Sequence, residues 1–330
     1  MHRRQFFTLL GGAAAAPFVP WRLAARAQQS TRPVVAFVSN VPRESYAGLM
    51  SAFARGLSEK GFAEGQGVTF DYRWVNSEHD LPALAVEMVA RNPAVLVGAG
   101  GTGSALALKQ ATTRVPIVFI IGSDPAKFGL VASLNRPGGN ITGVTSLSNV
   151  LAAKQLEMLH DLAPDVATIG LLLNPENPNA ENDAGDVRRA AETVGHKLIV
   201  VVARSDTELN TAFAAAAEQR VTAMLIASDT FFLRRRTQIV TLSARYAVTT
   251  MYDRAEYVSS GGLMSYGSNR IEVFRQAGIY TGRILRGERP GDLPVQQPTK
   301  FDLVINLQTA KALGIDVPAT LLARADEVIE

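Results

Sequence analysis

Val34-Val35-Ala36-Phe37-Val38 is a continuous apolar run, and it sets the pattern that decides the fold. Its length and its valine content predict a strand that is buried on both faces of a sheet. An amphipathic stretch from Tyr46 to Lys60 follows and ends at Gly61, which predicts a helix. The same alternation repeats along the chain, and it is typical of a parallel sheet covered by helices on both faces.

Two series of such units follow each other, separated by the turn-rich stretch 135–140. The expected strands are 34–38, 68–74, 94–97, 116–121, 168–173, 198–202, 223–226, 248–252 and 303–305. The expected helices are 46–60, 81–90, 104–111, 152–162, 184–194, 207–218, 237–246 and 271–285, with a final helical region at the C-terminal end.

Two irregular stretches, 135–140 and the Gly-rich 261–267, predict more than one crossing between the two series. We therefore predict an α/β fold of two doubly wound lobes joined by a hinge. The ligand is expected in the interlobe cleft, beyond the carboxyl ends of the strands. The expected segments are 33–142 and about 266–295 for the first lobe, and about 145–264 with 300–330 as a candidate addition for the second. A single large doubly wound domain is the alternative.

The N-terminal residues predict export. Arg3 and Arg4 precede an apolar stretch from Phe6 to Val19, and Ala25-Arg26-Ala27 offers a cleavage site. The apolar stretch is too short to span a bilayer, which takes about 20 residues. The paired arginines favour a twin-arginine signal over 1–27, with an ordinary Sec signal as the alternative.

Charge and cysteine content narrow the class of protein. Removing residues 1–27 leaves 29 basic and 30 acidic side chains, so the sequence gives no reason to expect binding to nucleic acid or to an anionic surface. The chain has no cysteine, which excludes disulfides, thiol catalysis and lipid modification of a cysteine after the signal. We expect a free monomer in the periplasm.

A glycine-rich turn follows the third expected strand. Gly98-Ala99-Gly100-Gly101-Thr102-Gly103 matches the G-x-G-x-x-G spacing, but no acidic residue lies about 20 positions further on. Backbone N–H groups at a helix start, with the Thr102 and Ser104 hydroxyls, instead favour a seat for a carboxylate. A tight turn that needs glycine for its geometry alone is the alternative.

Four acidic residues end expected strands, where a ligand could meet them: Glu44, Asp124, Asp229 and Asp253. A ligand ammonium needs a buried carboxylate, because an unpaired charge is unfavourable in a closed cleft. Asp229 is the preferred candidate since Phe231 and Phe232 follow it. The alternative for each is a helix N-cap. The candidate ligand-binding residues are Asn40, Tyr46, Gly101, Thr102, Ser104, Ser123, Asp124, Asp229, Phe231, Phe232, Tyr252, Asp253 and Tyr266.

No set of catalytic residues emerges. The four histidines are dispersed without metal-ligand spacing, and no G-x-S-x-G elbow is present. We expect no cofactor, no metal and no enzymatic activity. An exported nucleotide-dependent oxidoreductase that uses the glycine-rich turn is one alternative, and a ligand sensor for a membrane receptor is another.

Long strings of the sequence carry a resemblance to a known family. They are Glu44-Ser45-Tyr46, 129–140, 261–267, 293–301 and 321–330. With them, the chain from about Pro33 to its end resembles the substrate-binding proteins of ABC transporters, in the tryptophan/tyrosine-type uptake group with the type I periplasmic-binding fold.

The resemblance implies two lobes, no catalysis, and delivery of a small ligand, such as an amino acid or an aromatic carboxylate, to a membrane permease with a cytoplasmic ATPase. It places Thr102 near a ligand carboxylate and Asp229 near an ammonium. The subgroup that the chain most resembles often has Asp-Pro-Phe-Phe where this chain has Asp229-Thr230-Phe231-Phe232. This departure leaves the identity of the ligand open.

Overall fold

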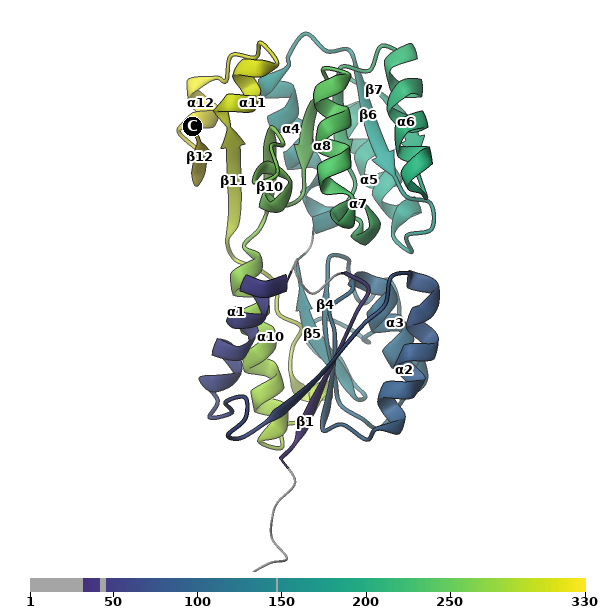
Figure 1. Cartoon of the computed structure of the whole chain (residues 1–330), viewed down its shortest axis with the longest axis vertical. Helices are drawn as coiled ribbons and strands as arrows, with labels where there is room; N and C mark the ends of the chain where they lie inside the picture. Colours follow the sequence, from purple (N-terminus) through teal and green to yellow (C-terminus); the bar gives the residue numbers. More distant parts are fainter. Residues whose placement is uncertain (1–31, 42–45, 147) are drawn as a thin grey trace, which may run out of the picture. The chain divides into compact units, whose positions relative to one another are not determined.

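The computed structural model describes residues 32–41, 46–146 and 148–330. The predicted signal over 1–27 and the candidate Glu44 lie outside the described residues. Residues from Pro33 onward form one compact unit that contains two sheets (Figure 1). No helix within the described ranges is long and apolar enough to span a membrane.

The first sheet is entirely parallel, with strand order β2-β1-β3-β4-β5. Its strands are β1 (Val34–Ser39), β2 (Thr69–Trp74), β3 (Val95–Gly98), β4 (Ile117–Ile121) and β5 (Ile141–Thr145).

Helices cover both faces of this sheet, as the continuous apolar runs predict. Val35 and Phe37 of β1 pack on one side in the cluster that contains residues of α1 (Ala47–Ser58) and α10 (Arg270–Leu285). Ala36 and Val38 pack on the other side with α2 (Leu81–Ala90) and α3 (Gly101–Ala111). The pairing of α1 with α10 brings a late segment of the chain back to the first sheet (Figure 1).

The second sheet has the order β12-β11-β10-β9-β8-β6-β7, and only the β10–β11 pair in it is antiparallel. Its strands are β6 (Thr168–Leu173), β7 (Lys197–Val202), β8 (Ala223–Ile226), β9 (Thr249–Tyr252), β10 (Met264–Ser268), β11 (Phe301–Asn306) and β12 (Glu327–Ile329). The helical elements of this part are η4 (Ser148–Leu151), α4 (Ala152–Leu162), α5 (Ala180–Thr193), α6 (Asp206–Glu218), α7 (Thr230–Arg234), α8 (Arg236–Arg245), α9 (Ala255–Val258), α11 (Leu307–Ala312) and α12 (Ala319–Leu322).

We call the first sheet with α1, α2, α3 and α10 the first lobe, and the second sheet with its helices the second lobe. The chain passes between them after β5, after β10, and between η5 (Pro290–Asp292) and β11. The backbone pairing of Val144 with Gln296 ties the last crossing to β5. The predicted α/β fold of two lobes is therefore confirmed.

Candidate functional site

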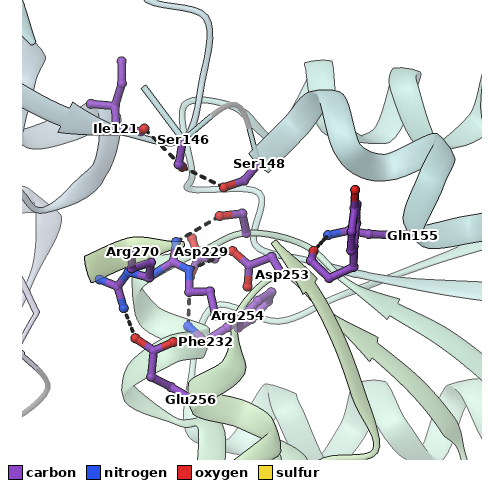
Figure 2. Close-up of polar contacts among 12 residues, drawn as sticks. Ile121, Ser146, Ser148, Gln155, Asp229, Phe232, Asp253, Arg254, Glu256 and Arg270 are labelled. Carbon is purple, nitrogen blue, oxygen red and sulfur yellow. Dashed lines mark hydrogen bonds and ion pairs between the residues drawn. The ribbon is translucent and has the colours of Figure 1, made fainter. Parts of the chain in front are cut away.

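A cavity lies between the two lobes, where strands of both sheets end. The first lobe and its crossings supply Tyr46, Gly101, Ile121, Ser146, Arg270 and Phe274 to its lining, and the second supplies Ser148, Thr230, Asp253, Arg254 and Ser268. A small recess in the second lobe shares Ser148 and Asp253 with it and adds Gln155, Asp183 and apolar side chains such as Leu171 and Val187. Figure 2 shows the polar contacts around this site.

The cavity is small in this arrangement, at about 50 Å³. That is room for a few water molecules. A ligand the size of an amino acid therefore enters only if the lobes separate and close again around it.

The glycine-rich turn forms the edge of the first lobe. Helix α3 begins at Gly101, whose φ of +79° favours glycine. A Cβ at Gly100 would lie 2.5 Å from Asn40 Oδ1. The buried Ser104 hydroxyl turns inward, where it accepts a hydrogen bond from Gly100 N and donates one to Gly101 O. The close approach to Asn40 and the positive φ agree with the alternative in which the turn needs glycine for its geometry.

Thr102 and Ser123 meet as a hydroxyl pair at the predicted carboxylate seat. Their oxygens are 2.7 Å apart, and both side chains are buried. Asn179, at the start of α5 in the second lobe, donates its amide to Thr102 Oγ1 at 3.1 Å. The structure thus brings Gly101, Thr102 and Ser123 together and adds a partner from the opposite lobe.

Asp229 lies at the N-cap of α7, deep between the lobes. Its Oδ1 accepts from Phe232 N at 3.0 Å (Figure 2). Its Oδ2 accepts from Asn177 at 2.8 Å and from Asn174 at 3.3 Å. Burial raises the pKa of this carboxyl, while these hydrogen bonds lower it. Asp229 therefore caps helix α7, which was the alternative to a role in ligand binding. Most of the acceptor positions of its carboxylate already have protein donors.

Asp253 follows β9 and lines both the cavity and the small recess. Its Oδ2 accepts from Arg254 Nε at 2.7 Å, and Arg254 also reaches Ser228 Oγ at 3.0 Å. Arg270 pairs with Glu256 close by (Figure 2). These pairs place two partly buried arginines and Asp253 on the wall of the site, with Glu256 paired to Arg270.

Aromatic rings flank this charged wall. The Tyr46 hydroxyl donates to Ala99 O, and its ring packs 5.4 Å from that of Phe274. The Arg270 guanidinium lies 5.8 Å from the centre of the Tyr46 ring and 5.7 Å from that of Phe274. Tyr46 thus lines the cavity together with Phe274 and Arg270, and its contact with a ligand stays a prediction.

Asp183 in α5 is the acidic residue that sequence reasoning missed. It is buried in the wall of the small recess, next to Gln155 and Asp253. Burial, together with the negative charges of Asp186, Asp253 and Asp229, raises the pKa of its carboxyl to about 8. A cationic group near Asp183 and Asp253 would lower that pKa and stabilise the ionised form.

The remaining candidates lie elsewhere. Asp124 accepts from Ala126 N at 2.9 Å in its own turn. Phe232 is fully buried, Tyr252 stacks on Tyr257 in the core at 4.5 Å, and the Tyr266 ring packs at 6.0 Å from that of Phe301. Phe231 lines a separate recess between the lobes.

Some residues that the sequence analysis missed lie just after a strand, and this position could have identified them. Asn174, Asn177 and Asn179 follow β6 directly, at the same edge of the sheet as Asp229 and Asp253. Ser146 follows β5 and donates to Ile121 O at 3.3 Å, and its hydroxyl is 2.9 Å from that of Ser148 (Figure 2). In the described ranges, no group of three or more His, Cys, Asp or Glu side chains could hold a metal ion.

Known proteins are similar to this chain in sequence and in fold. A family model described as "ABC transporter substrate binding protein" matches residues 34–329. A tyrosine-binding protein of Clostridioides difficile strain R20291 is 25% identical over 266 residues, which are 80% of this chain and 75% of that protein.

Two solved structures are also similar over most of the chain. A conserved domain protein from Vibrio cholerae O1 biovar El Tor strain N16961 has a TM-score of 0.84 and 30% identity over 90% of this chain and 99% of that one. An ABC domain from Streptococcus pneumoniae in complex with L-Trp has a TM-score of 0.83 and 25% identity, covering 91% of this chain and all of that one (100%).

Proposed function

Because this chain belongs to the ABC transporter substrate-binding protein family, whose members are binding proteins rather than enzymes, we propose that it carries a small amine-bearing ligand to an importer. Family membership overturns the oxidoreductase alternative. We propose that the segments predicted for the two lobes move as two bodies, which open to admit the ligand and then close around it.

The observation that carries the ligand class is the pair of acidic residues in the cavity wall. Asp183 and Asp253 are both buried, and the charges of Asp186, Asp253 and Asp229 add to burial in raising the pKa of Asp183, so negative charge is concentrated here. A ligand ammonium would be attracted to this negative charge and could form a charge-assisted hydrogen bond with it. We therefore propose that the ammonium binds at Asp183 and Asp253, and that Asp229 has a structural role.

The rest of the cavity suits the other parts of an amino acid. Arg254, Arg270 and the Ser146 and Ser148 hydroxyls offer donors to a carboxylate. The Tyr46 and Phe274 rings, and the apolar side chains of the small recess, offer surface to a hydrophobic or aromatic side chain. The relatives in complex with L-Trp and named for tyrosine support an amino acid with an aromatic side chain.

A binding screen tests this proposal. Purified mature protein, residues 28–330, is titrated by calorimetry with aromatic amino acids, with their decarboxylated amines and with their deaminated acids. We expect binding of compounds that retain the amine, and loss of that binding in Asp183→Asn. Glu192→Gln, an exposed change on the same helix, is the control and should bind as the wild type does. Equal binding of the deaminated acids would refute the assignment.

We also propose that the protein is exported to the periplasm as a monomer. There it delivers its ligand to a permease with its cytoplasmic ATPase. The predicted 1–27 signal supports export, and the family supports transport. A reporter fused behind residues 1–27 should reach the periplasm, and Arg3→Lys/Arg4→Lys should block it if the twin-arginine route is used. Deletion of a neighbouring permease gene should abolish uptake of the ligand. A sensor would retain uptake.

A further inference from the structure

A second recess lies between the lobes, and α7 contributes Thr230, Phe231 and Arg234 to its lining. Its volume is about 450 Å³, and polar side chains of both lobes line it, among them Glu78 of the first and Thr230, Arg234 and Asp206 of the second. Thr230 also lines the ligand cavity, so this recess and the cavity meet at one residue.

A set of hydrogen bonds crosses between the lobes at that residue. Asn40 Nδ2 donates to Thr230 Oγ1 at 3.1 Å and to Glu78 Oε1 at 3.3 Å. The Thr230 hydroxyl donates to the same Glu78 oxygen at 3.3 Å. Arg234 Nη1 donates to the Asn40 backbone carbonyl at 2.6 Å. Asn40 and Glu78 belong to the first lobe, and Thr230 and Arg234 to the second.

The contacts of Thr230 with Asn40 and Glu78, and that of Arg234 with Asn40, exist only while the lobes are together, because each joins groups of opposite lobes. The Asn40–Glu78 hydrogen bond lies within the first lobe. Asn40 is fully buried and Thr230 nearly so. Separating the lobes would expose them to water, which exchanges protein hydrogen bonds for solvent ones.

We propose that Asn40, Glu78 and Thr230 form a latch that stabilises the closed form from outside the ammonium and carboxylate positions, and so sets ligand affinity without contacting those groups. The proposal rests on the proposed function for its effect on affinity, but the latch itself is a property of the ligand-free protein. A ligand binds more tightly when the closed form is already populated, since less of the binding free energy is used to close the lobes.

Charge makes this latch sensitive to pH. Burial and the negative charge of Asp229 raise the pKa of Glu78, while hydrogen bonds from Thr230 and Asn40 and the charge of Arg234 lower it, and the net result is a pKa of about 7. The other charged groups around the recess are Glu176, Arg204, Asp206 and Arg235, and His79 and Asp80 lie beside Glu78 in η3 (Glu78–Asp80).

The sign of the pH dependence follows from this shift. In the open form Glu78 is in water and has its ordinary pKa, whereas in the closed form it binds its proton more tightly. Closure is therefore most favourable at low pH, becomes less favourable as the pH rises from about 4.5 to 7, and changes little above that.

Distance measurements on the ligand-free protein test the latch. The chain has no cysteine, so Val86→Cys on α2 and Ala217→Cys on α6 give two exposed sites for spin labels, one on each lobe. Distances between the two labels, measured by electron–electron double resonance, then report the ratio of closed to open protein at pH 5 and pH 8. We expect the doubly labelled wild type to show on the order of a tenfold higher ratio at pH 5.

Two variants shift this ratio in opposite directions. Thr230→Val removes the shared hydroxyl and should lower the ratio about fivefold at pH 5, the size expected for one lost hydrogen bond. Glu78→Gln keeps an acceptor for Asn40 and Thr230 without the charge, so it should raise the ratio at pH 8 about tenfold and remove most of the pH dependence. A merely misfolded protein would not close more tightly, so Glu78→Gln keeps the test valid if Thr230→Val is unstable.

Thr207→Val is the matched control, because it makes the same change at an exposed position of the same recess. It should leave the ratio unchanged. Thr230→Pro is a further variant: proline is tolerated in the first turn of a helix and lacks the hydroxyl, so it should behave as Thr230→Val does.

Three results would overturn the latch. They are a wild type that is entirely open at both pH values, Thr230→Val and Glu78→Gln variants with the wild-type ratio, and a Thr207→Val control that shifts as much as Thr230→Val. None of these measurements uses a ligand. Failure of the latch is therefore distinguishable from failure of the amino-acid assignment.

Discussion

Asn179 and Thr102 join the two lobes at the carboxyl ends of their strands, with Asn179 Nδ2 3.1 Å from Thr102 Oγ1. Asn179 occupies the N-cap position of α5, yet its side chain does not cap that helix and reaches the opposite lobe instead. The same threonine oxygen lies 2.7 Å from Ser123 Oγ. The predicted carboxylate seat is thus part of the contact that closes the site.

Removing the Thr102 hydroxyl should weaken both the fold and the ligand complex. Thr102→Val leaves the buried Ser123 hydroxyl and Asn179 amide without their shared partner, which costs about 1 to 2 kcal/mol of unfolding free energy. We expect about a tenfold loss of ligand affinity if the same free energy is lost from the closed form. Urea unfolding and calorimetric titration measure the two effects. Thr113→Val, an exposed change just after α3, should alter neither by more than about 0.5 kcal/mol.

Asp183→Asn should make the ligand-free protein more stable while abolishing ligand binding. The raised pKa of about 8 means that the folded state binds this proton more tightly than the unfolded state does. Wild-type stability therefore falls as the pH rises from about 4 to 8 and then levels off. Asparagine removes that penalty, which at pH 8.5 should be on the order of 2 to 4 kcal/mol.

Thermal unfolding from pH 4 to pH 9 measures this effect. The two proteins should have similar stability near pH 4 and diverge as the pH rises. A variant that is less stable than the wild type at pH 8.5 would show that the carboxylate, rather than the carboxylic acid, is the favoured form in the fold.

The fold could be predicted because most strands are continuous apolar runs, as in Val34–Val38 and Leu171–Leu173. Three strands were missed for a physical reason. Ile141–Thr145 and Met264–Ser268 alternate apolar residues with threonine, serine and glycine, so neither shows a continuous run. Glu327–Ile329 has only three residues, and a helical region was expected there. Each forms a strand because a neighbouring strand supplies its hydrogen bonds.

The site was harder to predict than the fold. The strand-end pattern pointed to Tyr46 and Asp253, which line the cavity, and to Thr102 and Ser123, which contact each other, because parallel strands place their carboxyl ends together. Their role in ligand binding stays a prediction. Strand ends could not show that Asp183, within a helix, faces the recess. They also could not show how available the Asp229 carboxylate is to a ligand, because its oxygens accept hydrogen bonds from asparagines that are distant in sequence.

In the glycine-rich turn, alanine should be tolerated at Gly103 but not at Gly100 or Gly101. In Gly100→Ala the new Cβ would meet Asn40 Oδ1 at 2.5 Å, and in Gly101→Ala it would strain a backbone with φ of +79°. We expect losses of about 1 to 3 kcal/mol and about 1 kcal/mol, respectively. At Gly103 the nearest atoms lie at 3.4 Å or more, so Gly103→Ala should be neutral or stabilising by up to about 1 kcal/mol. Urea unfolding of the three variants tests this pattern. A turn that simply requires flexibility would instead lose stability in all three variants.

The Arg270–Glu256 pair should behave as a partly buried ion pair, since its two side chains are 16% and 32% exposed. Burial opposes ionisation of Glu256, but the charges of Arg270 and Arg254 prevail and hold its pKa below the usual value. Glu256→Gln leaves Arg270 between the Tyr46 and Phe274 rings without its main counter-charge, and should lower the unfolding free energy by about 3 kcal/mol at pH 7. Because a carboxyl with a lowered pKa stabilises the fold only while it is ionised, the difference between variant and wild type should shrink as the pH falls below about 4.5.

A double-mutant cycle separates the pair from its surroundings. Arg270→Met with Glu256→Gln removes both charges, and the double variant should recover most of the stability lost in Glu256→Gln. Arg275→Met with Glu272→Gln is the surface comparison, since that pair lies on the same helix with greater exposure. Its coupling energy should be below about 1 kcal/mol. Equal coupling in the two cycles would mean that burial at the cavity wall adds nothing to the Arg270–Glu256 interaction.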